Sequence, residues 1–292
     1  RTGAPSRTRE GQADGGNIVP DVLPPASPWF RSALVSENLS TAGAPGDGSS
    51  AAPGAPPAEP MSVPEACFSV FFSPSRVFAE RQTRDWVLPL IILTVLVSLL
   101  FYGTKPYLQP ALDAEMARQM AVTERANPQL TPTQIDGIRS MQDKFAIVGV
   151  VVGIPAIVIS LAILLWVIGR FVESKQTVKA AFVVATFAYF PKVLASLAGG
   201  LIGIVRDPAH LTGLYSVTIG PGLFLDAATS SPVLLAVAGR LDVFTLWITA
   251  LLAIGLHVTG KVPKGQAYIV AAVIWIIGAL PGLFNALRAT AG

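Results

Sequence analysis

The chain has 292 residues, of which 52% are hydrophobic and only 13% are charged. Soluble domains carry roughly 25% charged residues, so this composition indicates an integral membrane protein whose main partner is the lipid bilayer. The net charge of +3 gives no electrostatic support for nucleic-acid binding. With one cysteine and two histidines, we expect no disulfide framework, no bound metal and no cofactor.

Residues 1–60 are rich in Ala, Pro, Gly and Ser and contain few side chains that could form a core. Such a segment cannot offset its ordering entropy, so we predict a disordered tail over residues 1–60 and a membrane domain over residues 61–292. Met61 is the first methionine and stands where ordered-looking sequence begins. One hypothesis is that the biological chain starts at Met61; the alternative is that residues 1–60 belong to it.

Five apolar stretches are long enough to cross a bilayer, which takes about 17 to 25 residues. They lie at about residues 86–103, 145–169, 180–205, 243–258 and 267–287. The fold class predicted is therefore all-α, a polytopic bundle of five transmembrane helices preceded by the disordered tail. The loop between the first two spans also has helical signals, with Thr131 as a helix cap and Gln134 three residues later.

Lys192 stands midway along the third span, directly after Pro191. Because proline removes a backbone hydrogen bond, the span is predicted to kink or break there, with Lys192 reaching an interface or a polar cavity. The alternative is that Lys192 is an intramembrane ligand or ion-pair residue.

Arg240 and Asp242 stand at the head of the fourth span. A charge centred in a span costs about 2.5 to 3.5 kcal/mol, so we expect the helix to start at Asp242. Its carboxylate would cap the free amides, and Arg240 would lie just outside, at the headgroups. In the alternative, a buried Asp242 pairs with a basic residue of another helix.

Two further patterns concern packing. Glycines recur at four-residue spacing at Gly149 and Gly153 and at Gly278 and Gly282, which predicts close contacts between helices or between copies in a homo-oligomer. The segment TIGPGLF, residues 218–224, is predicted to be a Gly-Pro turn in an ordinary loop; a re-entrant turn is the alternative.

Basic residues predict the orientation. They are dense before the first span, between spans two and three, and between spans four and five: Arg76, Arg81, Arg84, Arg170, Lys175, Lys179, Lys261 and Lys264. The positive-inside rule then places the N-terminus in the cytoplasm and the C-terminus across the membrane.

The sequence contains no phosphate loop, nucleophile elbow, metalloprotease box or cysteine pair. We therefore predict no catalytic residue and a protein that is not an enzyme. The residues singled out as functional or structural candidates are Lys192, Pro191, Arg240, Asp242 and Trp247.

Three segments in order, FFSPSRVFAERQTRDWVLPL, AYFPKVLASL and RLDVFTLWITALLAIGL followed by KGQAYIVAAVIW, together resemble the Yip domain family of Ypt/Rab-interacting proteins. Pro191, Asp242, Phe244 and Trp247 match its pattern. The resemblance covers about residues 67–287 and implies five transmembrane helices, a cytoplasmic N-terminus and no known catalysis. The Ala/Pro/Gly-rich tail is typical of a bacterial gene, and a bacterium has no Rab cycle, so the trafficking role of eukaryotic relatives does not carry over.

Two functions follow as hypotheses. The first is a non-enzymatic protein of a bacterial inner membrane that organises or binds membrane-protein partners within the bilayer. The second is a small permease or channel-like transporter that uses Lys192.

Overall fold

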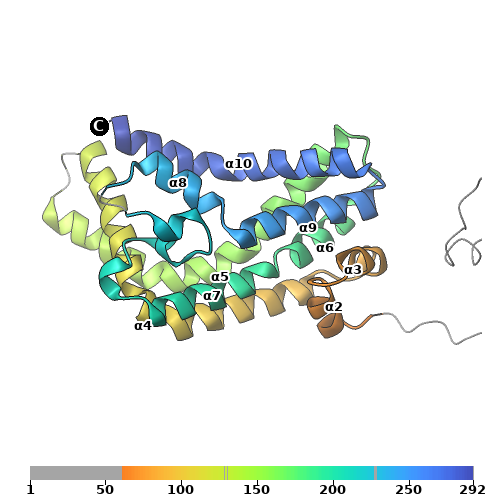
Figure 1. The fold of residues 1–292 in the computed structure, drawn as a ribbon, viewed down its shortest axis with the longest axis horizontal. Helices are drawn as coiled ribbons and strands as arrows, with labels where there is room; N and C mark the ends of the chain where they lie inside the picture. Colours follow the sequence, from red (N-terminus) through yellow and green to blue (C-terminus); the bar gives the residue numbers. More distant parts are fainter. Residues whose placement is uncertain (1–60, 128, 130, 227–228, 292) are drawn as a thin grey trace, which may run out of the picture. The chain divides into compact units, whose positions relative to one another are not determined.

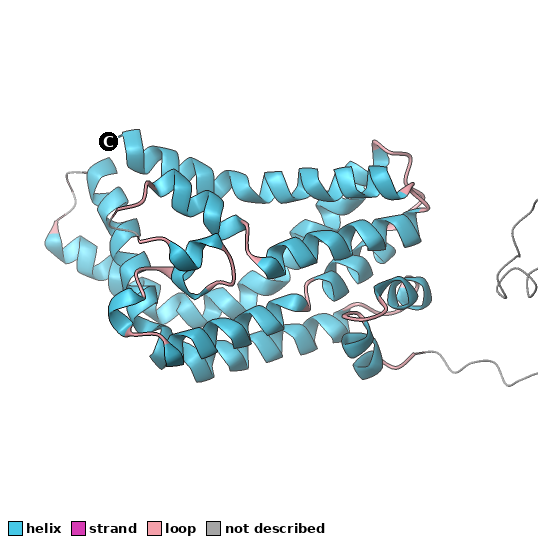
Figure 2. Cartoon of the chain, viewed as in Figure 1, coloured by secondary structure: helices cyan, strands magenta, loops and turns pink. Residues whose placement is uncertain are grey.

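The computed structural model describes residues 61–127, 129, 131–226 and 229–291, which belong to one compact unit, Ala58–Gly292. Every regular element in these ranges is a helix (Figure 2). The predicted disordered tail at residues 1–60 lies outside the described residues, and the hypothesis of a start at Met61 stays a prediction.

Within the described ranges, five helical segments are long and apolar enough to cross a membrane by length and composition. They are Val87–Arg125, Val148–Arg170, Val178–Val205, Val243–Gly260 and Lys264–Thr290. This number confirms the predicted all-α polytopic architecture.

The first two spans belong to helices much longer than the predicted apolar stretches. Helix α4 (Val87–Ala126) has 40 residues and α5 (Pro132–Arg170) has 39. Pro106 and Pro110 lie inside α4, and Figure 1 shows its far half turning across the end of the bundle. The apolar pattern identifies only the part of each helix that can lie in lipid. The helix itself is longer, because its backbone hydrogen bonding continues into the polar residues next to that part.

Two short helices precede the first span. Helix α2 (Val63–Ser69) begins with a capping box between Ser62 and Glu65, and α3 (Pro74–Arg81) has proline in its first turn. They lie at the end of the bundle where α6 begins and α9 ends, which we call the α2–α3 end (Figure 1).

The third span is interrupted, whereas the fourth and fifth are continuous helices. The third consists of α6 (Val178–Ala188) and α7 (Pro191–Val205), and α9 (Val243–Gly260) is preceded by the short α8 (Pro232–Arg240). Three 3₁₀ turns connect α7 to α8: η1 (Pro208–His210), η2 (Leu214–Val217) and η3 (Pro221–Phe224). Helix α10 (Lys264–Ala291) packs along α8 and α9.

The main apolar core lies between α3, α4, α5, α6, α9 and α10. Its largest fully buried side chains include Phe78, Leu93, Leu165, Phe187, Leu251 and Leu256. A small second cluster, Leu108, Ala111, Leu211 and Val217, joins α4 to the connection between α7 and α8. The core therefore holds the interrupted third span and the fourth span side by side.

Candidate functional site

The third span is interrupted at its middle by a tight turn. Helix α6 ends at Ala188 and α7 begins at Pro191. Across the junction the Lys192 amide donates to the Tyr189 carbonyl at 3.0 Å and the Val193 amide to the Phe190 carbonyl at 2.9 Å. These bonds join residues three apart, which is the pattern of a 3₁₀ turn. The chain direction is kept through this turn, so α6 and α7 form one span.

The fourth span begins directly after a break between the short α8 and α9. Asp242 is the N-cap of α9: its Oδ1 accepts from the amides of Phe244 and Thr245 at 3.0 Å each, and its Oδ2 accepts from the Thr245 hydroxyl. The side chain is buried. The helix thus starts where the sequence predicted, because this carboxylate satisfies amides that have no partner within the helix.

Arg240, for which a position at the headgroups was predicted, packs against the middle of α10. Its Nη2 donates to the Trp275 carbonyl at 2.9 Å, and its guanidinium lies 5.7 Å from the Trp275 ring centroid. A Cβ added at Gly278 would come within 2.8 Å of the same Nη2. Gly278 therefore leaves room for a guanidinium, whereas nothing lies within 4 Å of a Cβ placed at Gly282.

The exposed apolar side chains of α10 show how deep this contact lies. They run along the helix as Tyr268, Ile269, Val273, Ile276, Leu280, Phe284 and Leu287. In a membrane-spanning helix such a band faces lipid. Trp275 and Gly278 stand near the middle of the band, so the Arg240 guanidinium contacts α10 within its lipid-facing part. The sequence did not predict this contact, because it depends on the neighbouring helix that receives the side chain.

The interruption of the third span and the break before α9 are electrostatically connected. The Asp242 carboxylate interacts with Lys192, with Arg240 and with Tyr189. Lys192 is exposed, and among the described residues it has no hydrogen-bond or ion-pair partner. We call Tyr189, Lys192, Arg240 and Asp242 the mid-membrane cluster, after the position of Lys192 midway along the third span. With Lys192 protonated, the cluster holds two cations and one anion, so one positive charge has no counter-charge inside it.

The connection between α7 and α8 folds back to this level. The Val243 amide donates to the Ile219 carbonyl at 3.0 Å, and Gly220 packs so closely that an added Cβ would lie 3.0 Å from the Asp242 Cα. Arg206 Nη1 donates to the carbonyls of Ser216 and Leu223 at 3.0 Å each. The TIGPGLF segment contains the predicted Gly-Pro turn, in which the Leu223 amide donates to the Gly220 carbonyl at 3.1 Å, and the segment packs against the start of α9.

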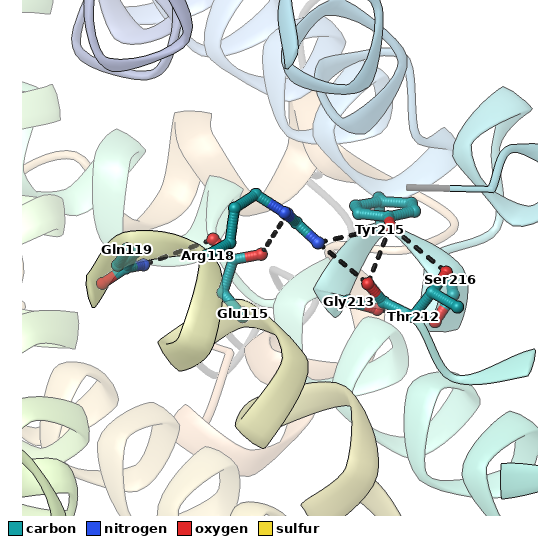
Figure 3. Close-up of polar contacts among 7 residues, drawn as sticks. All are labelled: Glu115, Arg118, Gln119, Thr212, Gly213, Tyr215 and Ser216. Atoms are coloured by element: carbon teal, nitrogen blue, oxygen red, sulfur yellow. Dashed lines mark hydrogen bonds and ion pairs between the residues drawn. The ribbon is translucent and has the colours of Figure 1, made fainter. Parts of the chain in front are cut away.

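A second arginine ties this connection to α4. Figure 3 shows Arg118 between Glu115 on its own helix and the segment of Thr212 and Tyr215. Its Nη1 bonds to Glu115 Oε2, and its Nη2 donates to the Thr212 carbonyl, both at 2.8 Å. Nη2 also donates to the Tyr215 hydroxyl at 3.3 Å. The sequence did not predict this contact, because Arg118 and Tyr215 are 97 residues apart and neither belongs to a recognisable motif.

The other two candidate residues have packing contacts. Pro191 is buried at the start of α7. The Trp247 ring lies 5.6 Å from that of Phe71, nearly edge to face, and joins α9 to the α2–α3 turn. These contacts assign both residues a place in the scaffold around the cluster.

The chemistry that the cluster can perform is the binding of an anionic group through Lys192. The acceptors of Asp242 are occupied by the α9 amides and the Thr245 hydroxyl, whereas Lys192 presents an unpaired ammonium. No group of three or more His, Cys, Asp or Glu suited to a metal occurs among the described residues. An anionic group brought to Lys192 would complete the charge balance.

Comparison with known proteins supports the architecture. The family model of the Yip1 domain matches residues 68–284. The membrane protein YknW of Bacillus subtilis (strain 168) is 25% identical over 158 residues, which covers 54% of this chain and 65% of YknW, just under two thirds of its length. No solved structure matches. Because the family model extends over most of the chain and reaches into all five spans, the protein belongs to the Yip1 domain family.

Proposed function

We propose that this Yip1-family protein is a non-enzymatic membrane protein that binds partners within the bilayer through Lys192. One observation carries the proposal: Lys192 is exposed at the middle of the third span and lacks a hydrogen-bond or ion-pair partner among the described residues. A charge at that depth costs about 2.5 to 3.5 kcal/mol, and a partner helix with an acidic residue would offset this cost.

The experiment compares tagged wild type with Lys192→Met and Lys179→Met, purified from native membranes in mild detergent. Lys179 is also exposed but lies at the start of α6, where its ammonium reaches water. We expect Lys192→Met to lose co-purifying membrane proteins that wild type and Lys179→Met retain, at equal expression and thermal stability. An identical set of partners in all three would refute the proposal.

A permease is the second candidate, favoured by the interruption of the third span beside the start of the fourth at the mid-membrane cluster. Interrupted helices at the bilayer midplane build the substrate sites of many secondary transporters. In that case a water-filled path would reach Lys192, and the uncompensated positive charge would attract an anionic solute.

Cysteine accessibility distinguishes the two candidates. Lys192→Cys is treated with a water-soluble, membrane-impermeant thiol reagent, with Lys179→Cys as the water-exposed control and Val95→Cys, exposed on the apolar part of α4, as the lipid-facing control. Reaction at the rate of the Lys179 control supports a permease. Protection equal to that of Val95 supports partner binding.

We also propose a bacterial inner-membrane location, with the α2–α3 end in the cytoplasm and the C-terminus across the membrane. Exposed Lys175, Lys179, Lys261 and Lys264 all lie at the α2–α3 end. Short, lysine-rich connections of this kind remain on the cytoplasmic side during insertion.

A further inference from the structure

Helices α2 and α3 cross the direction of the spans. In Figure 1 the spans run along the page, whereas α3 is seen nearly end-on. Helix α3 packs against α9 and α6, and α2 packs against α4. An element that crosses transmembrane helices at a steep angle lies roughly parallel to the membrane plane.

The side-chain contacts place this pair beside the membrane-embedded parts of α6 and α9. Phe71, in the turn between α2 and α3, contacts Trp247, which is five residues from Asp242 but thirteen from Gly260. The Arg81 guanidinium lies 5.9 Å from the ring centroid of Phe187. Phe187 is four residues from Pro191 but nine from Val178. Trp247 lies in the second turn of α9 and Phe187 near the end of α6, so both contacts fall on membrane-spanning helices and not on the loops beyond them.

At this level the pair exposes two phenylalanines. Phe68 is 74% exposed and Phe72 is 85% exposed. Phe68 lies in the last turn of α2, and Phe72 lies in the turn that follows it, where its amide donates to the Ser69 carbonyl at 3.1 Å. Aromatic side chains left this bare are unfavourable in water, whereas acyl chains would cover them.

The surroundings have the charge expected beside a phospholipid surface. The α2–α3 end exposes Arg84, Lys175, Lys179, Lys261 and Lys264, against the exposed acids Glu65, Asp85 and Glu173. Arg76 and Glu80 form an ion pair with an N–O distance of 2.7 Å and add no net charge. The excess of basic residues complements anionic headgroups.

We infer that α2 and α3 form an in-plane membrane element, with Phe68 and Phe72 inserted among the acyl chains of the leaflet at the α2–α3 end. The basic residues around it contact anionic phospholipid headgroups. Amphipathic helices that bind the bilayer surface insert their apolar side chains to a similar depth.

The test uses the full chain in phosphatidylcholine–phosphatidylglycerol vesicles, with a nitroxide attached to Phe68→Cys or Phe72→Cys. Power-saturation spectroscopy compares collisions with oxygen, which concentrates in acyl chains, and with a water-soluble nickel chelate. Val95→Cys is the lipid control and Lys175→Cys the water control. Cys67 is retained because it is buried, and unmutated protein measures its background labelling.

Both phenylalanine sites should resemble Val95→Cys, with high accessibility to oxygen and low accessibility to the chelate. Accessibility to the chelate like that of Lys175→Cys would place the pair in water and overturn the inference. Low accessibility to both reagents would also overturn it, because protein, either a partner or a second copy, would then cover the site.

Discussion

Arg240 shows at the scale of one residue how a cation is accommodated among membrane-spanning helices. Its guanidinium has a carbonyl, an aromatic face and a carboxylate around it, supplied by Trp275 and Asp242. The space it occupies exists because position 278 has no side chain. An arginine so placed has its charge distributed over protein groups instead of lipid, which lowers the cost of its depth.

Enlarging Gly278 therefore tests the position of the guanidinium. In Gly278→Leu the new side chain displaces the Arg240 guanidinium from the Trp275 carbonyl, and we expect a loss of about 1 to 3 kcal/mol in unfolding free energy. Gly282→Leu is the control, since nothing lies within 4 Å of its added Cβ. When all variants are unfolded by heat in the same detergent, only Gly278→Leu should have a lower Tm than wild type. Equal changes in the two variants would contradict the placement of Arg240.

Cys67, the one cysteine in the chain, gives a prediction about pH. Burial raises the pKa of its thiol to about 11, with a smaller opposing effect of Arg81. The reactive form is the thiolate, so alkylation at neutral pH should be slower than for a free cysteine, whose pKa is about 8.5. The rate should climb as the pH approaches 11. The measurement is the rate of maleimide labelling as a function of pH, with unfolded protein as the control. A labelling rate in the folded protein that follows the same pH dependence as in the unfolded protein would contradict the raised pKa.

At the scale of the elements, the connection between α7 and α8 depends on arginine side chains more than on its own hydrogen bonding. Arg206 holds it from α7, and Arg118 holds it from α4. Gly213 has a φ of 156°, and an added Cβ there would lie 2.8 Å from the Arg118 Nη2. The extension of α4 beyond its apolar part thus acts as a support for the connection that reaches the mid-membrane cluster.

Removing that support should loosen the connection. Hydrogen bonds from a charged donor contribute about 1.5 to 3 kcal/mol each. Arg118→Ala should therefore raise, by about tenfold or more, the fraction of molecules in which the α7–α8 connection is detached from α4. Arg125→Ala is the matched control, because Arg125 also lies in α4, nearer its C-terminal end, and is exposed. Limited trypsin digestion should cut Arg118→Ala after Arg206 faster than wild type or Arg125→Ala. Unchanged cleavage would show that Arg118 is dispensable for the connection.

At the scale of the whole molecule, five spans place the two ends of the membrane domain on opposite faces. If the α2–α3 end is cytoplasmic, an impermeant maleimide should label Thr290→Cys in cells with an intact inner membrane. Lys261→Cys should react only after that membrane is disrupted. Cells that express the unmutated chain report the contribution of Cys67. The reverse pattern of labelling would invert the proposed orientation.

The fold class was predictable because a bilayer imposes a simple requirement on the sequence. A spanning helix satisfies its own backbone, so twenty or so consecutive apolar residues suffice to identify it. Local signals also predicted the Asp242 cap and the Thr131–Gln134 capping box, since each depends on residues within one helical turn. The break at Pro191 follows from the missing amide of proline.

Contacts between distant segments were decided by the tertiary structure alone. The sequence by itself determined that lipid is the solvent of this chain, how many times the chain crosses it and where helices start. It did not determine that the third span breaks beside the start of α9, that Arg240 reaches α10, or that residues 218–224 fold back to Asp242. The physical reason is that a helix start depends on neighbours three or four residues away. The depth of a charge depends instead on which other helix has space and a hydrogen-bond acceptor to receive it.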